Sequence, residues 1–183
     1  MGLDERLKFN PEEVAKRAKY LIEISKELKE NPSPEKSGGY LTLVIDGFDD
    51  FTSLRVGEKI PAEKLVKYEI FSQEKAHRVY AHWLRKFPFE KSLQIVSSYQ
   101  SRNPKEEKWG GAVLFNKEVK DYEPDIVSFS GLSEFADEAL SYIIGYCLGF
   151  QKNDGLLEKI KEVSKNPMVD EMFSRFNEKF QKS

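Results

Sequence analysis

The strongest constraint on the fold is an apolar stripe in the last third of the chain. Between residues 132 and 148, apolar side chains recur with the period of an α-helix. Ser133 is a favourable N-cap and Gly149 a favourable C-terminal stop, so the pattern predicts a helix over residues 133–149. A helix with one apolar face must bury that face against another element. The stripe consists of Leu132, Phe135, Ala136, Ala139, Leu140, Ile143, Ile144, Cys147 and Leu148.

The segments before this helix predict a sheet for it to cover. Strands are expected over 40–46 and 52–56 as a hairpin, over 92–100 more weakly, and over 110–116 and 125–131. Helices are expected over 11–31 and 60–87. The order α-β-β-α-β-β-β-α, with short connections between strands, favours an antiparallel sheet flanked by helices. The predicted class is α+β, with the architecture of profilin-like and PAS-like domains.

The last part of the chain predicts a separate helical extension. Residues 1–150 are expected to form one domain, and residues 151–183 an amphipathic C-terminal extension that Asn166 and Pro167 divide into two short helices. Met168, Met172, Phe173 and Phe176 give the second of these helices an apolar side, which is expected to dock on a neighbouring subunit.

Composition excludes several classes of protein. The 183 residues carry a formal charge of −2, which argues against binding nucleic acid through phosphate contacts. Aromatic residues make up 13% of the chain, too many for a disordered protein. Cys147 is the single cysteine, so no internal disulfide forms and a reducing compartment fits. No signal peptide and no apolar run of roughly 18 residues is visible, so a soluble cytoplasmic protein without membrane partners is expected.

No set of catalytic or metal-binding residues emerges from the motifs. His77 and His82 lie five apart, whereas metal-binding pairs on a helix usually lie four apart. Cys147 belongs to the apolar stripe, which predicts a structural thiol. Ser130 does not follow the G-x-S-x-G pattern of hydrolases, because residue 128 is serine. Whether the protein is an enzyme stays open, with the balance against it, and neither catalytic nor metal-ligating residues are assigned.

Two other positions each allow two interpretations, and a third, Lys75, allows one. The pair Gly110 and Gly111, at the start of a strand, indicates either a bulge or close backbone crossing, or a ligand lying against bare backbone. Ser130 and Gly131 indicate either a tight turn into the next helix or an anion site at its start. Lys75, judged by its polar and small neighbours alone, is a surface lysine.

Taken in order, these motifs resemble a known family. Asp46 ends the strand in LVIDGFDDF, Lys75-Ala76 lies in the long helix, and Gly110-Gly111 precedes a strand. Ser130-Gly131 ends the next strand, and Asp137-Glu138 lies early in the last long helix. Over residues 11–149 this pattern resembles the GlcG/HbpS-like group, often labelled haem-degrading or haem-binding. The chain departs from it at Val113, where the family often has proline.

The resemblance implies a small-molecule-binding protein, with haem or another tetrapyrrole as the ligand. The resemblance places the pocket between the sheet and the long helix. It does not cover the extension 151–183. An alternative is a non-catalytic structural or interaction module that forms homo-oligomers, as members of the family do. The ligand-binding residues expected on this basis are Tyr68, Phe71, Lys75, Gly110, Gly111, Ser130 and Gly131.

Overall fold

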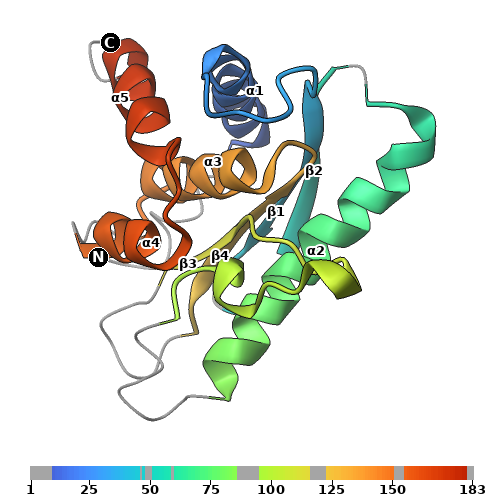
Figure 1. Cartoon of the computed structure of the whole chain (residues 1–183), viewed down its shortest axis with the longest axis vertical. Helices are drawn as coiled ribbons and strands as arrows, with labels where there is room; N and C mark the ends of the chain where they lie inside the picture. Colours follow the sequence, from blue (N-terminus) through green and yellow to red (C-terminus); the bar gives the residue numbers. More distant parts are fainter. Residues whose placement is uncertain are drawn as a thin grey trace.

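The computed structural model describes residues 10–45, 47, 51–58, 60–85, 95–115, 123–150 and 155–180 (Figure 1). The acidic side chains of Asp46, Asp49 and Asp50 lie outside these ranges. The helices are α1 (Pro11–Glu27), α2 (Ala62–Leu84), α3 (Glu134–Cys147), α4 (Gly155–Ser164) and α5 (Val169–Phe180), with short 3-10 helices η3 (Ser98–Ser101) and η4 (Pro104–Glu106). The strands are β1 (Gly38–Val44), β2 (Phe51–Gly57), β3 (Ala112–Phe115) and β4 (Asp125–Ser130).

The four described strands form one sheet in the order β2-β1-β4-β3, and every neighbouring pair is antiparallel. The expected α+β class with an antiparallel sheet is therefore confirmed. The two central strands, β1 and β4, pair from Tyr40 opposite Ser130 to Val44 opposite Ile126. This register brings the start of β1 next to the end of β4, where the chain turns into α3.

The expected strand over 92–100 is wrong for the residues that the structure describes there. Ser97 makes only an isolated bridge to Val113, and Ser98–Ser101 is a 3-10 helix. The cause is a capping box, in which the Ser97 hydroxyl accepts from the Tyr99 amide while the Gln100 side chain accepts from the Ser97 amide. These reciprocal bonds begin a helical turn where the weak apolar alternation indicated a strand.

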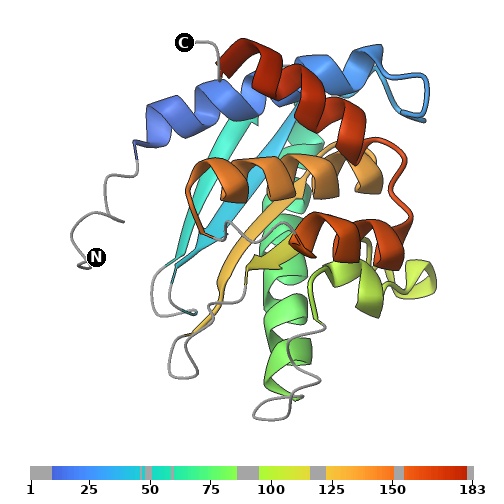
Figure 2. The same ribbon diagram turned by 90° about the vertical axis from the view of Figure 1, so that its left-hand side faces the viewer.

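Helices cover both faces of the sheet (Figure 2). Helices α1 and α3 lie on one face, and α2 crosses the other. Alternate residues along β1 point to opposite faces, as strand geometry requires: Leu41 and Leu43 join the core beneath α1 and α3, whereas Val44 joins the core beneath α2. Thr42 also faces α2, where its hydroxyl accepts a hydrogen bond from Ser72.

Helices α4 and α5 pack on the same core as α1 and α3. Met168, Met172 and Phe176 are at most 2% exposed, so the expectation that they dock on a neighbouring subunit is wrong. Asn166 fixes the turn between the two helices, because its side-chain amide donates to the Phe135 carbonyl and to the Glu138 carboxylate. Within the described residues, no helix is both long and apolar enough to cross a membrane.

Candidate ligand-binding site

A cavity of about 350 Å³ lies between α2, the turn from β4 into α3, and the loop that follows α1. Tyr68, Phe71, Lys75, Ser130 and Gly131 line it, so five of the seven expected ligand-binding residues meet at one place. Gly110 and Gly111 do not line it. The other lining residues are Pro32, Ser33, Lys36, Trp109, Leu132, Ser133, Glu134, Phe135 and Asp137.

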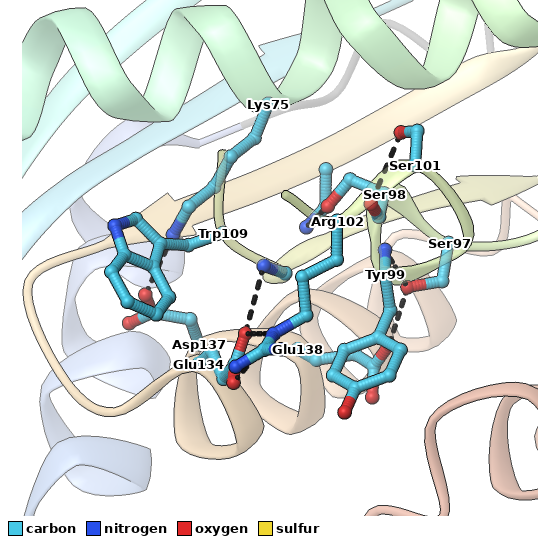
Figure 3. A network of polar contacts seen from close by, with 12 residues as sticks. Lys75, Ser97, Ser98, Tyr99, Ser101, Arg102, Trp109, Glu134, Asp137 and Glu138 are labelled. Atoms are coloured by element: carbon cyan, nitrogen blue, oxygen red, sulfur yellow. Dashed lines mark hydrogen bonds and ion pairs between the residues drawn. The ribbon is translucent and has the colours of Figure 1, made fainter. Parts of the chain in front are cut away.

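Lys75 and Asp137 form a buried ion pair at this cavity. The Lys75 ammonium lies 2.8 Å from Asp137 Oδ2 (Figure 3). It also donates to the Phe129 carbonyl at 2.9 Å. The two side chains are 3% and 4% exposed, so the surface-lysine interpretation of Lys75 is wrong. The other Asp137 oxygen accepts from the Leu132 amide at 2.9 Å. Burial raises the pKa of Asp137, and the charge and hydrogen bond of Lys75 oppose that rise.

Gly111 makes the room that this ion pair needs. Its φ is +125°, and a Cβ there would lie 2.7 Å from Asp137 Cβ and 2.9 Å from Lys75 Nζ. The group that approaches Gly111 is therefore the chain's own Lys75. Of the two interpretations of the glycine pair, the structure favours close packing within the protein over a ligand against bare backbone. Gly110 instead donates its amide to Glu134 Oε2 at 3.1 Å.

Gly131 permits the close crossing that turns the chain from β4 into α3. Its φ is +150°, and a Cβ would lie 2.3 Å from the Gly38 carbonyl oxygen on β1. The N-cap residue of α3, Ser133, makes no side-chain cap, because its hydroxyl donates to Asn31 Oδ1 at 3.1 Å. The first turn of α3 thus faces the cavity without a capping side chain of its own, and Glu134 and Phe135 in that turn line the cavity.

Residues 98–109, which include η3, form the rim of the cavity and are called the rim segment. Sequence reasoning did not assign this segment to the site. The Arg102 guanidinium lies over the rings of Tyr99 and Trp109, 5.5 and 5.6 Å from their centroids, and pairs with Glu134 at 2.8 Å (Figure 3). Tyr99 stacks on Phe135. One arginine, Arg102, between two aromatic residues, Tyr99 and Trp109, was the available signal.

Arg78 on α2 fastens this rim segment to the body of the domain. Its guanidinium donates to the backbone carbonyls of Ser98, Ser101 and Trp109. It also pairs with Glu74 on its own helix at 2.7 Å. The position of Trp109 is therefore set by hydrogen bonds from an arginine whose side chain is only 11% exposed.

Among the charged residues that line the cavity, Lys36 differs from the others in its hydrogen-bond partner, which is a carbonyl rather than a charged group. Lys75 neutralises Asp137, and Arg102 neutralises Glu134. The Lys36 ammonium donates to the Leu132 carbonyl at 3.0 Å, and within the described ranges no carboxylate lies at ion-pair distance from it. Lys36 is consequently the one charged residue of the described lining that has no ion-pair partner, although its charge acts at longer range on Asp137, where it opposes the rise in pKa that burial causes.

The lining does not fit a haem whose iron is held by a protein side chain. Haem iron takes histidine, cysteine, methionine or tyrosine as its axial ligand. Of these, the described lining offers only Tyr68. Burial, with a further contribution from the nearby Asp137 charge, raises the pKa of the Tyr68 hydroxyl and so disfavours the phenolate that would bind iron.

The histidines and the cysteine that could hold a metal or act as nucleophiles lie away from the cavity. No group of three or more histidine, cysteine or acidic residues is placed to hold a metal ion in the part of the chain that is described. His77 and His82 do not line the cavity. Cys147 is half-buried, and burial raises the pKa of its thiol, which does not suit a nucleophile.

No family model matches the chain, and no curated protein or solved structure matches it either. The resemblance to the GlcG/HbpS-like group therefore stays a prediction from the sequence.

Proposed function

We propose that the chain is a cytoplasmic small-molecule-binding protein whose ligand occupies the cavity between α2 and the start of α3. One observation carries the proposal: four aromatic side chains and an unpaired lysine converge on a cavity of about 350 Å³. Ligand sites are typically clefts of roughly 300–1,000 Å³ that combine apolar walls with a few placed polar groups. The single cysteine is compatible with a reducing compartment.

Haem is the ligand that the resemblance suggests, and the lining favours a smaller molecule that contains no metal. The volume lies near the lower end of the range for ligand sites, and the lining tyrosine is poorly suited to iron. A titration with haem should therefore produce no Soret shift that depends on Tyr68. A shift that disappears in Tyr68→Phe would restore the haem assignment.

The general proposal is tested by blocking the cavity. Ser33 lines the cavity from a loop, so Ser33→Trp should fill it with little effect on the core. Glu30→Trp, at an exposed position nearby, is the matched control. A thermal-shift screen of small metabolites should yield compounds that stabilise the wild type and the control but not Ser33→Trp. Hits that stabilise all three proteins equally would contradict the proposal.

A second candidate function is homo-oligomerisation, which exposed apolar residues at two places on α2 favour. Val66, Ile70 and Leu84 are 66%, 55% and 45% exposed, and Phe51 on the neighbouring edge strand β2 is 48% exposed. An edge strand can pair with its own copy about a two-fold axis. Analytical ultracentrifugation should then give a dimer that Ile70→Glu dissociates and Lys64→Glu does not. A monomeric wild type at high concentration would exclude this candidate.

A further inference from the structure

We propose that the ligand is a flat aromatic monocarboxylate, an inference that rests on the proposed function. Tyr68 and Phe71 reach the cavity from α2, Phe135 from α3, and Trp109 from the rim segment. Aromatic walls bury large apolar area and favour stacked or edge-on contact with another ring. The cavity is thus built for a flat apolar body of one or two rings.

Lys36 supplies the position for the negative charge. Its ammonium has three donors and gives one of them to the Leu132 carbonyl, so two remain for a ligand. Residue Lys36 is half-buried, where a charge-assisted hydrogen bond is stronger than at an exposed site. The first turn of α3 also lines the cavity, but its positive dipole end is offset by Glu134 and Asp137 in that turn, so the charge for a ligand anion comes from Lys36.

The buried pair of Lys75 and Asp137 limits the ligand to one charge. Both side chains already have their partners inside the protein, at 2.8 Å from each other. A cationic ligand would compete with Lys75 for Asp137 and would meet the Lys36 ammonium without a carboxylate to balance it. A dianion such as a phosphate monoester would bring a second charge for which the described lining has no free cation.

Isothermal titration of the full chain with four naphthalene probes tests this assignment. The probes are 2-naphthoate, its neutral analogue 2-naphthamide, the cation 2-naphthylmethylammonium and the dianion 2-naphthyl phosphate. The naphthoate should bind at least about 10-fold more tightly than each of the other three. Lys36→Met should weaken naphthoate about 10-fold and leave the amide within roughly 2-fold, whereas Lys36→Arg retains the preference.

Lys29→Met is the matched control. Like Lys36, Lys29 lies in the segment that follows α1, but it is exposed and does not line the cavity. The variant should bind all four probes like the wild type. Lys36→Gln replaces Lys36→Met if the latter unfolds at a lower temperature than the control.

The outcomes separate this inference from the proposed function. Equal binding of the amide and the carboxylate, both abolished by Ser33→Trp, would overturn the monocarboxylate assignment and leave the cavity as a ligand site. Tighter binding of the phosphate or the ammonium would do the same. Failure of every probe to bind the wild type would also overturn the assignment, and a metabolite screen with no hit sensitive to Ser33→Trp would then overturn the proposed function as well.

Discussion

The two faces of the sheet differ in the polarity of the side chains buried against them. The face beneath α1 and α3 is a continuous apolar core that also includes residues from α4 and α5. The face beneath α2 has a smaller apolar cluster around Trp83, and toward the start of α3 it becomes polar, with Ser72, Lys75 and Ser128 buried. Buried polar groups cost stability unless they are paired. The face beneath α1 and α3 therefore holds the main apolar core, while the face beneath α2 carries the candidate site.

The largest effect is expected from breaking the buried ion pair. Lys75→Met leaves Asp137 buried without its cation, and should lower the free energy of unfolding by about 3–5 kcal/mol. The double variant Lys75→Met/Asp137→Leu should recover most of this loss, since no buried charge is then unpaired. Urea denaturation of both variants measures the difference. A double variant as unstable as the single one would mean that the pair itself stabilises the α2 face.

Gly111→Ala should have the next largest effect. The added methyl group meets Asp137 and Lys75 in a backbone conformation with positive φ, so a loss of about 2–4 kcal/mol is expected. Gly149→Ala is the matched control, because its φ is also positive, +72°, but nothing lies within 4 Å of the added Cβ. It should cost about 1 kcal/mol. Equal costs in thermal unfolding would show that backbone strain, rather than lack of room, is decisive at Gly111.

The pH dependence of stability should reveal Glu138, a buried carboxylate on α3. Burial raises the pKa of Glu138 above its ordinary value of 4.5, against hydrogen bonds from Ser164, Ser97 and Asn166. The folded protein therefore holds this proton more tightly than the unfolded chain does. The resulting stability is fully present below about pH 4.5 and is lost as pH rises through the folded pKa.

Glu138→Gln removes this dependence, so the stability of the variant relative to wild type should improve as pH rises. Chemical denaturation at a series of pH values measures the change. The exposed substitution Glu30→Gln should follow the wild type at every pH. Parallel curves for wild type and Glu138→Gln would show that the pKa of Glu138 is the same in the folded and unfolded chains.

The smallest effect is expected at Ser128. Its hydroxyl is buried on the α2 face and has no hydrogen-bond partner among the described residues, so Ser128→Ala should change the free energy of unfolding by less than about 0.5 kcal/mol. Ser72→Ala, on the α2 helix that covers Ser128, removes a hydroxyl that donates to Thr42 and to the Ser128 carbonyl. This variant should lower the free energy of unfolding by about 1 kcal/mol. Equal losses in the two variants would indicate that Ser128 is satisfied by water.

The sequence was most informative where one physical signal dominates. The period of the apolar stripe predicted α3. The order of the motifs predicted that Lys75, Ser130 and Gly131 share a site, and all three line the cavity. The strand prediction for residues 92–100 failed over the described residues 95–100, because a capping box around Ser97 outweighed weak apolar alternation. Sequence reasoning also placed Lys75 on the surface, because burial of a lysine depends on Asp137, a partner 62 positions away.

The rim of the cavity lay beyond sequence reasoning for a related reason. Trp109 is held at the cavity by a hydrogen bond from Arg78 on α2, 31 positions away in the sequence, and by the guanidinium of Arg102 in its own segment. Contacts of this kind between residues far apart in the sequence leave no periodic pattern. The glycine pair at 110 and 111 gave a visible signal, but only the structure identified Lys75 as the group that needs the space.

Native mass spectrometry of the protein purified from its own cells tests the central claim most directly. The wild type and Lys29→Met should retain a small organic molecule, lost in Ser33→Trp, whose fragments contain an aromatic ring and a carboxyl group. Identical ligand-free masses for all three proteins, together with no stabilisation of the wild type by any carboxylate, would contradict the assignment of the α2 face as a ligand site.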